Sequence, residues 1–283
     1  LDRLTKETRA PERLMKYAIK LLDYMVQGGY AKKTQGNGAN AYCLTPKVKE
    51  LGGVYTFMEM CILENPESIY MINMLYERGH NLAAMFQGNY DPLEMLIGKD
   101  RADYARYFYT HSASCQGNNQ LVLSIIREMV KNIPQHRPLR VLEIGSGMGG
   151  MTAHMLDILK GCACEFYYTD IAQVLVKQGK KQFQKYDFVT YQVLDIELPP
   201  ETQGFDLASF DLITGLDVLH AVKDIDTALT HVASLLKPHG KLLVSDMVGK
   251  QLTIDFLFGP IDGWWRFDDA YRTDSPLIDQ TLW

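Results

Sequence analysis

Hydrophobic residues near the start of the chain recur every three or four positions, a spacing that places side chains on one face of a helix. The recurring positions are Leu14, Ala18, Leu21, Leu22 and Met25. Two consecutive glycines, Gly28 and Gly29, then interrupt the pattern. The pattern therefore predicts an amphipathic helix that ends at the glycine pair.

A polar stretch separates this helix from the next one. Residues 32–38 (KKTQGNG) show no apolar periodicity, and we expect a loop there. Thr45 and Pro46 then suit the N-cap and the first turn of a second helix. This order of elements is winged-helix-like, and we predict that residues 1–133 form a mainly helical N-terminal lid subdomain. Because basic residues are few here, lid packing or a dimer contact is favoured over DNA binding.

In the second half of the chain the pattern changes to short, nearly continuous apolar runs. Segments of helix length separate the runs, which indicates parallel strands with helices on both faces of the sheet. The five runs are residues 139–145 (LRVLEIG), 164–170 (CEFYYTD), 188–195 (FVTYQVLD), 210–217 (FDLITGLD) and 241–248 (KLLVSDMV). We therefore predict a doubly wound α/β core over residues 134–283, which begins at a proline-flanked link.

Composition narrows the class of protein. Hydrophobic residues make up 47% and charged residues 22% of the 283-residue chain, which excludes disordered, collagen-like and coiled-coil proteins. No apolar run approaches the ~20 residues of a bilayer span and no signal segment is recognised, so we expect a cytoplasmic protein without membrane contact. The net charge of −5 disfavours nucleic acid as a partner. Cys162 and Cys164 lack further ligands at zinc spacing, so we expect no metal.

The first run of the second half leads into a glycine-rich loop, residues 143–150 (EIGSGMGG). Glycines there permit a tight strand-to-helix turn and let a ligand approach the backbone at a helix N-terminus. Gly145, Gly147 and Gly150 also match the dinucleotide fingerprint, and Asp170 has the spacing of a carboxylate that binds a ribose. The loop thus predicts a nucleotide-like ligand and leaves its identity open.

Three further residues help to choose between a dinucleotide and S-adenosylmethionine. Glu143 precedes the glycines, as in the E/D-x-G-x-G-x-G variant typical of S-adenosylmethionine binding. Asp195 ends the third run, where a carboxylate could hold an adenine amino group. His220 follows the fourth run, at the edge where open α/β sheets bind ligands. No GxxxxGK sequence is present, which excludes a P-loop, and the pattern favours a class I methyltransferase over a dehydrogenase.

Several motifs occur in the order typical of one enzyme family. They include residues 75–96 (LYERGHNLAAMFQGNYDPLEML), 140–152 (RVLEIGSGMGGMT), 193–197 (VLDIE), 218–222 (VLHAV) and 258–269 (FGPIDGWWRFDD). On these motifs the chain, chiefly residues 100–265, resembles the C-methylating methyltransferase domains of modular polyketide synthases. The resemblance implies S-adenosylmethionine as cofactor, with S-adenosylhomocysteine as product. It also implies neighbouring synthase domains and an acyl carrier protein, whose phosphopantetheine arm presents a β-ketoacyl chain for methylation at the α-carbon.

The resemblance also implies roles for individual residues. His220 matches the family's catalytic histidine and would act as general base, with Asp246 in the place of the glutamate that the family pairs with it. The implied cofactor-binding residues are Glu143, Gly145, Ser146, Gly147, Asp170, Ile171, Asp195, Ile196 and Asp217. Tyr109, Trp264 and Trp265 are the expected substrate-binding residues, with core or lid packing as their alternative role.

Departures from the family pattern leave other functions open. Asp217 replaces an asparagine, Val222 a threonine and Asp246 a glutamate. These changes and the winged-helix-like start make O-methylation of a carrier-bound hydroxyl or enol the main alternative. A structural methyltransferase-like domain without turnover is an alternative of another class. Asp246 could also cap the following helix instead of pairing with His220.

A complete class I methyltransferase sheet has seven strands and ends in an antiparallel hairpin. After Val248 the sequence contains the tryptophan segment 263–265 (GWW) rather than a clear hairpin. We therefore expect that the parent chain continues past Trp283, and that an isolated domain carries an unpaired sheet edge.

Overall fold

The computed structural model describes residues 11–36, 39–97, 107, 113–131 and 137–283. The chain divides into two compact units, each of which is discontinuous in the sequence. Unit 1 comprises Leu1–Ala113 and Lys250–Trp265, and unit 2 comprises Ser114–Gly249 and Arg266–Trp283.

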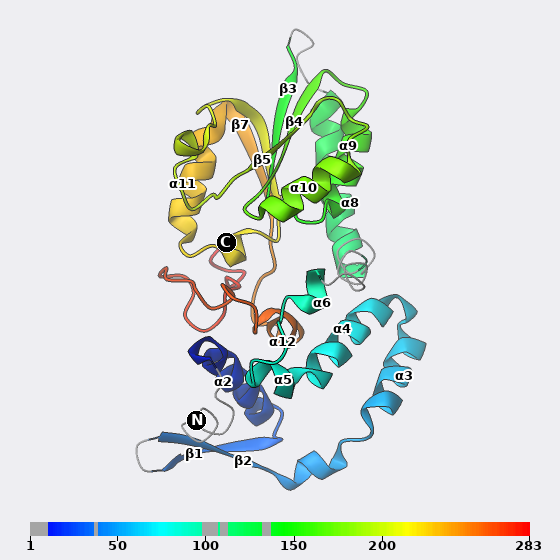
Figure 1. Cartoon of the computed structure of the whole chain (residues 1–283), viewed down its shortest axis with the longest axis vertical. Helices are drawn as coiled ribbons and strands as arrows, with labels where there is room; N and C mark the ends of the chain where they lie inside the picture. Colours follow the sequence, from blue (N-terminus) through cyan, green and yellow to red (C-terminus); the bar gives the residue numbers. More distant parts are fainter. Residues whose placement is uncertain (1–10, 37–38, 98–106, 108–112, 132–136) are drawn as a thin grey trace. The chain divides into compact units, whose positions relative to one another are not determined.

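Unit 2 is built on a five-stranded parallel sheet with the strand order β5-β4-β3-β6-β7 (Figure 1). The strands are β3 Leu139–Ile144, β4 Cys164–Asp170, β5 Val189–Val193, β6 Phe210–Leu216 and β7 Leu236–Ser245. All five predicted runs form strands, and the last of them begins earlier than predicted, at Leu236. The α/β, Rossmann-like fold class is thereby confirmed.

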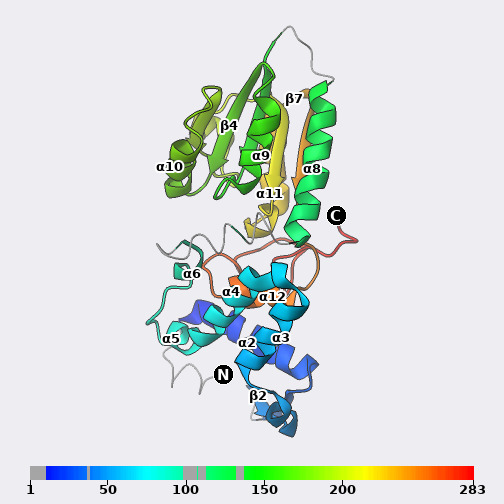
Figure 2. The ribbon, with the colours of Figure 1, turned by 90° about the vertical axis from the view of Figure 1, so that its right-hand side faces the viewer.

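Helices cover both faces of this sheet. They are α8 Ala113–Lys131, α9 Gly150–Leu159, α10 Gln173–Gln182 and α11 Ile225–Leu235, with the short 3-10 helices η3 Pro200–Gln203 and η4 Leu219–Ala221. Helices α8 and α9 lie beside each other along the sheet in both views (Figure 1 and Figure 2). Because side chains alternate along a strand, the sheet has a separate core on each face.

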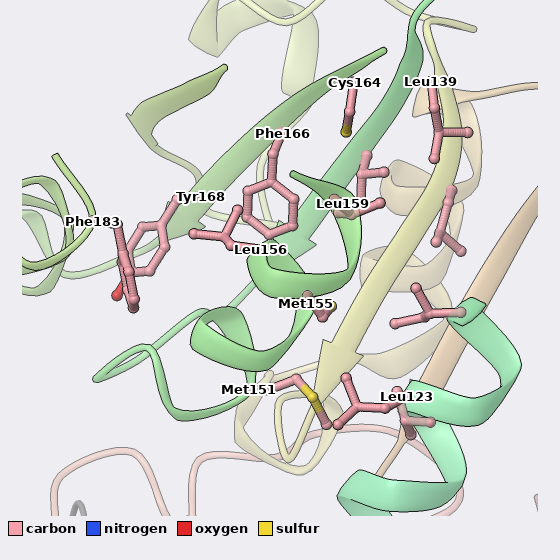
Figure 3. Close-up of a cluster of buried hydrophobic side chains, with 14 residues drawn as sticks. Leu123, Leu139, Met151, Met155, Leu156, Leu159, Cys164, Phe166, Tyr168 and Phe183 are labelled. Carbon is pink, nitrogen blue, oxygen red and sulfur yellow. The ribbon is translucent and has the colours of Figure 1, made fainter. Parts of the chain in front are cut away.

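Each face of the sheet packs a distinct hydrophobic cluster. On one face, Val141 of β3 and Phe166 of β4 pack with Met155 and Leu156 of α9, as Figure 3 shows for the residues around α9. On the opposite face, Leu142 belongs to a cluster formed with α11 and η4. These four residues of β3, β4 and α9 and Leu142 are fully buried, so the sheet is a rigid base for the loops that leave its ends.

Unit 1 is mainly helical and contains one small sheet. Its helices are α2 Glu12–Gln27, α3 Val54–Glu64, α4 Ile69–His80, α5 Leu82–Phe86, α6 Glu94–Ile97 and α12 Leu252–Phe258, with η1 Pro46–Glu50 and η2 Pro66–Ser68. Of the apolar face predicted for the first helix, Leu14 and Ala18 of α2 are buried, whereas Leu21, Leu22 and Met25 are half-buried. Gly28 and Gly29 end α2 as predicted.

The predicted polar loop after α2 is wrong in part. Strands β1 (Ala31–Gly36) and β2 (Ala39–Leu44) pair antiparallel there. The four residues Lys32–Gln35 of β1 are polar and exposed, so the sequence shows no apolar alternation there that would predict a strand. Thr45 is the N-cap residue of the next helix and Pro46 lies in its first turn, as predicted, but this helix is only the short 3-10 helix η1. The Thr45 hydroxyl makes no capping bond and donates to the carbonyl of Gly29 (2.7 Å) instead.

The two compact units differ from the domain division expected at residue 133. Helix α8 groups with the sheet, because Val122, Leu123 and Ile126 are buried in the cluster of β3 and α9. Residues 250–265, which include α12, group with the N-terminal helices instead. Whether residue 133 or residue 113 separates independently folding pieces stays a prediction. Within the described residues, no helix is both long and apolar enough to span a bilayer.

Candidate functional site

The predicted site residues of unit 2 meet at the carboxyl edge of the parallel sheet. The strand register places the ends of neighbouring strands together: Ile144 of β3 pairs with Gly215 of β6, and Leu216 of β6 pairs with Ser245 of β7. The loops after β3, β6 and β7 therefore leave the sheet side by side. In doubly wound sheets, ligands bind outside this edge, where the strand order reverses.

Two positions of the loop after β3, Gly145 and Gly147, require glycine for different reasons. Gly145 and Gly147 have φ values of 59° and 57°, in the left-handed region. A Cβ atom on Gly145 would lie 2.5 Å from Cγ2 of Val218, whereas one on Gly147 would meet only the Gly145 carbonyl oxygen, at 3.8 Å. Gly145 thus permits close packing against the β6 loop, and Gly147 leaves open space beside the loop.

Asp170, at the end of β4, holds this loop in place. Its Oδ2 accepts a hydrogen bond from the Gly147 N–H (2.9 Å), and its Oδ1 accepts one from the Ala172 N–H (2.8 Å). The carboxylate is buried, and burial raises its pKa. Since an ionised carboxylate has about four acceptor sites, two remain for other donors such as ribose hydroxyls.

The carboxyl group of Glu143 is buried inside the fold. The residue is 3% exposed, and burial raises the pKa of its carboxyl to about 7. The hydroxyl of Thr152 on α9 donates to Oε2 (2.5 Å), and that of Thr169 donates to the Glu143 main-chain carbonyl (2.6 Å). Glu143 therefore ties β3 to the first turn of α9, beneath the glycine loop.

The loop after β5 carries Asp195 and Ile196. Oδ1 of Asp195 accepts from the N–H of Glu197 (2.9 Å), and Ile196 is buried in the α11 cluster. The side-chain amide of Gln203 bonds both main-chain groups of Asp195, at 2.8 Å each. The sequence analysis assigns no role to Gln203. Ile171, after β4, is 59% exposed.

Asp217 and His220 follow β6. Asp217 has a φ of 54°, a left-handed conformation that aspartate and asparagine tolerate better than most residues. Burial and the neighbouring Asp246 raise the pKa of the Asp217 carboxyl to about 6. The Asp217 N–H donates to the Ser245 carbonyl (2.8 Å), which joins the loops after β6 and β7.

His220 and Asp246 come together from these two loops. Nδ1 of the imidazole lies 2.7 Å from Oδ1 of Asp246, and the His220 N–H donates to Oδ2 (3.1 Å). The His220 side chain is 10% exposed and that of Asp246 is 2% exposed. Asp246 does not cap α12, which begins at Leu252 with Gln251 as its N-cap. A carboxylate at this distance can fix the orientation of an imidazole ring.

Two of the residues expected to bind substrate have hydrogen-bond partners within unit 1. Trp264 and Trp265 belong to unit 1, where their indole N–H groups donate to Asp255 (3.0 Å) and to the Gly259 carbonyl (2.7 Å). Trp264 is buried and stacks on Phe258. Their role toward substrate stays a prediction, and Tyr109 lies outside the described residues. Among the residues described, no cluster of His, Cys, Asp and Glu could hold a metal ion.

Comparison with known proteins gives the class of the chain. Residues 142–242 match the family described as a methyltransferase domain. This match covers the glycine loop, β4, β5, β6 and the first part of β7. The chain therefore contains a methyltransferase domain, with the class I fold whose enzymes use S-adenosylmethionine.

The curated relatives include polyketide synthases of several fungi. The non-reducing polyketide synthase Preu3 of Preussia isomera is 34% identical over 209 residues, and the lovastatin diketide synthase mokB of Monascus pilosus is 32% identical over 213 residues. The match covers 72% and 74% of this chain, but only 8% of each relative.

Two carbon methyltransferases are among the solved structures similar to this chain. CurJ and DszA are each 27% identical, with TM-scores of 0.86 and 0.87. The matches cover 99% and 98% of this chain, and 74% and 72% of those chains. The methyltransferase domain of the citrinin polyketide synthase, at 24% identity and a TM-score of 0.87, shares the fold. The chain is thus similar to the carbon methyltransferases of polyketide synthases.

The site fits an S-adenosyl nucleoside. Gly147 leaves room for a ligand against the backbone, Asp170 keeps acceptor capacity, and Asp195 presents a second, partly exposed carboxylate on the next loop. These residues provide carboxylate oxygens that can accept from ribose hydroxyls, and a backbone turn with open space beside it, as ribose recognition requires.

Proposed function

We propose that the chain transfers a methyl group from S-adenosylmethionine to the α-carbon of a β-ketoacyl chain carried on an acyl carrier protein. The observation that carries this proposal is the 2.7 Å contact between His220 Nδ1 and Asp246 Oδ1, on loops next to the glycine loop. The polyketide synthase relatives and the carbon methyltransferase neighbours support the substrate class. Since the chain spans 5–9% of its curated relatives, the carrier protein and neighbouring domains are part of the proposal.

The proposed chemistry requires a base. Bound S-adenosylmethionine supplies an electrophilic methyl group on a sulfonium. His220 Nε2 would accept the α-proton, and the C–H electron pair would form the enolate. The enolate carbon would then take the methyl group, whose bond to sulfur breaks so that S-adenosylhomocysteine leaves as a neutral thioether. Asp246 would accept the Nδ1–H of His220 and so fix the ring with Nε2 toward the proton that it removes. The Asp246 carboxylate would also stabilise the imidazolium once it forms.

The cofactor would be held by the edge residues described above. The turn at Gly145–Gly147 would receive the ligand against main-chain atoms, and Asp170 would accept the ribose hydroxyls. Asp195 would take the adenine amino group. Glu143 would not contact the cofactor; it would fix the position of β3 relative to α9 on either side of the glycine loop.

A substitution of His220 tests the proposed base. His220→Gln should lower methyl transfer by at least ~100-fold while affinity for S-adenosylhomocysteine changes less than ~3-fold, because general-base catalysis contributes about 10²–10⁴-fold. Transfer is measured by intact mass on a β-ketoacyl carrier protein, and affinity by calorimetry. His154→Gln, at an exposed position of α9, is the matched control.

Fragmentation of the product locates the methyl group. A methyl on the α-carbon supports the proposal, whereas a methyl on oxygen assigns the enzyme to the O-methylating alternative. A wild-type chain that binds the cofactor but transfers no methyl, also to a 3-hydroxyacyl carrier, would instead identify a structural domain. Full activity of His220→Gln would remove the histidine from the chemistry.

A further inference from the structure

The loop that carries His220 has little regular structure of its own. It contains only the three-residue 3-10 helix η4, and it starts from the left-handed Asp217. Leu219 and Val222 are buried, which takes their main-chain groups away from water as well. Within the loop, the N–H groups of Ala221 and Val222 donate to the carbonyls of Val218 (3.0 Å) and Leu219 (3.4 Å). Buried carbonyl groups need hydrogen-bond donors, and those of the following residues need donors from another part of the chain.

The donors come from the segment 266–272. Arg272 donates from Nη1 to the carbonyls of Leu219 (3.5 Å) and His220 (3.0 Å). It donates from Nη2 to the carbonyls of Val222 (2.7 Å) and Lys223 (3.1 Å). The carbonyl of Ala221, between these residues, accepts from Nε of Arg266 (3.2 Å). Every carbonyl from residue 219 to residue 223 therefore accepts a hydrogen bond from this segment.

Arg272 is itself fixed by a buried ion pair. Its Nε and Nη2 donate to Oδ2 of Asp269, at 2.9 and 2.6 Å, and the two side chains are 0% and 2% exposed. Oδ1 of Asp269 accepts from the Arg272 N–H (3.1 Å), and Oδ2 also accepts from the N–H of Ile225 at the start of α11 (3.3 Å). The planar guanidinium thus has one available orientation, with its N–H groups aimed at Asp269 and at the loop.

We propose that Arg272, held by Asp269, is a positioning residue that sets the location of the His220 imidazole. Asp246 bonds the ring and the N–H of His220, and Arg272 bonds the carbonyl of the same residue. The histidine is therefore held at its side chain and at both ends of its main chain. This inference rests on the proposed function, because it concerns the placement of the base.

Arg272→Lys is the informative variant. Lysine keeps the charge beside Asp269 but cannot present the planar fork that reaches the carbonyls on both sides of the loop. We expect kcat for methyl transfer to fall by about 100-fold, the scale of a 1 Å misplacement, with little change in KM or in affinity for S-adenosylhomocysteine. Arg137→Lys is the matched control, because Arg137 forms a bidentate pair with Asp211 in the same unit, at the amino end of β3 and β6.

A spectroscopic measurement separates positioning from general stability. In ¹⁵N-histidine-labelled protein, the ring signals of His220, assigned by their loss in His220→Gln, should move in Arg272→Lys and stay in place in Arg137→Lys. A double-mutant cycle should show that Arg272→Lys has no further effect on the residual rate when His220 is glutamine. The cycle reports coupling between the two residues, which a loss of stability alone would not produce.

The outcomes distinguish this inference from the proposed function. If His220→Gln is inactive but Arg272→Lys matches Arg137→Lys in kcat and in the His220 signals, the positioning role is overturned. If His220→Gln is fully active, His220 is not the base and the proposed function fails. The ring signals still test whether Arg272 places the histidine. Loss of folding in Arg272→Lys, seen as loss of native spectra across the whole protein, would assign Arg272 to stability and overturn the positioning role.

Discussion

At the scale of single residues, Glu143 combines burial with an acidic group. In the unfolded chain its carboxyl ionises near its ordinary pKa of 4.5, and in the folded chain burial raises this pKa to about 7. Between these pH values the folded state keeps a proton that the unfolded state has released. Stability therefore falls as pH rises through this window, by about 3 kcal/mol from this group.

Glu143→Gln tests that dependence. The amide cannot ionise, so the variant should gain stability relative to wild type as pH rises from 4.5 to above 7. The measurement is the free energy of unfolding in denaturant at several pH values. Glu128→Gln, at an exposed position of α8, should run parallel to wild type. Parallel curves for Glu143→Gln as well would show that the buried carboxyl does not carry the raised pKa.

Gly145 is constrained by its backbone and by its neighbour. Gly145→Ala would place a methyl group 2.5 Å from Val218 Cγ2 on a residue with a φ of 59°. We expect a loss of stability of about 1–3 kcal/mol, with weaker S-adenosylhomocysteine binding. Gly161→Ala, where a Cβ meets nothing within 4 Å, is the control. If adding Val218→Ala restores binding in full, the contact and not the backbone conformation is responsible.

At the scale of elements, the sequence predicts the strands of the sheet well and the small hairpin poorly. Strands β3, β4 and β6 are buried on both faces and therefore read as continuous apolar runs. The hairpin of unit 1 shows four consecutive exposed polar residues from Lys32 to Gln35, so its pairing depends on backbone hydrogen bonds that leave no apolar pattern.

The same reasoning explains which site residues could be predicted. Asp170, Asp195 and His220 follow strands, and parallel strands end at one edge, so their proximity could be inferred. Arg272 lies 52 residues after His220 in the chain and no strand end or glycine motif marks it. Its role depends on tertiary contacts with main-chain carbonyls of the loop. Every residue has such a carbonyl, so the sequence of the loop does not indicate which donor will bind it.

Helix α8 offers a test of the packing of unit 2. Ile126 is 1% exposed in the cluster of Val141 and Met155, whereas Leu121 on the same helix is 61% exposed. Ile126→Ala should lower the free energy of unfolding by about 2–5 kcal/mol. Leu121→Ala should change it by less than about 0.5 kcal/mol. Equal effects in chemical denaturation would contradict the packing of α8 against the sheet.

At the scale of the whole molecule, the two units predict where the chain can be divided. A fragment of residues 114–283 retains α8, whereas a fragment of residues 134–283 exposes the surface that Val122, Leu123 and Ile126 cover. We expect the shorter fragment to be less stable by about 2 kcal/mol for each of these side chains. Unfolding curves and dye binding to exposed apolar surface measure the difference. Equal midpoints would instead support the boundary predicted at residue 133.

The discontinuity of the units has a consequence for synthesis on the ribosome. Unit 1 starts with α2, but it is completed only by residues 250–265, where Asp255 receives hydrogen bonds from Tyr24 and Trp264. At ordinary elongation rates these residues emerge on the order of 10 s after the first 113. The strands of the sheet are translated in that interval. Helices α2 to α6 are thus translated well before residues 250–265, and in the nascent chain they lack these native partners until the strands of the sheet have been synthesised.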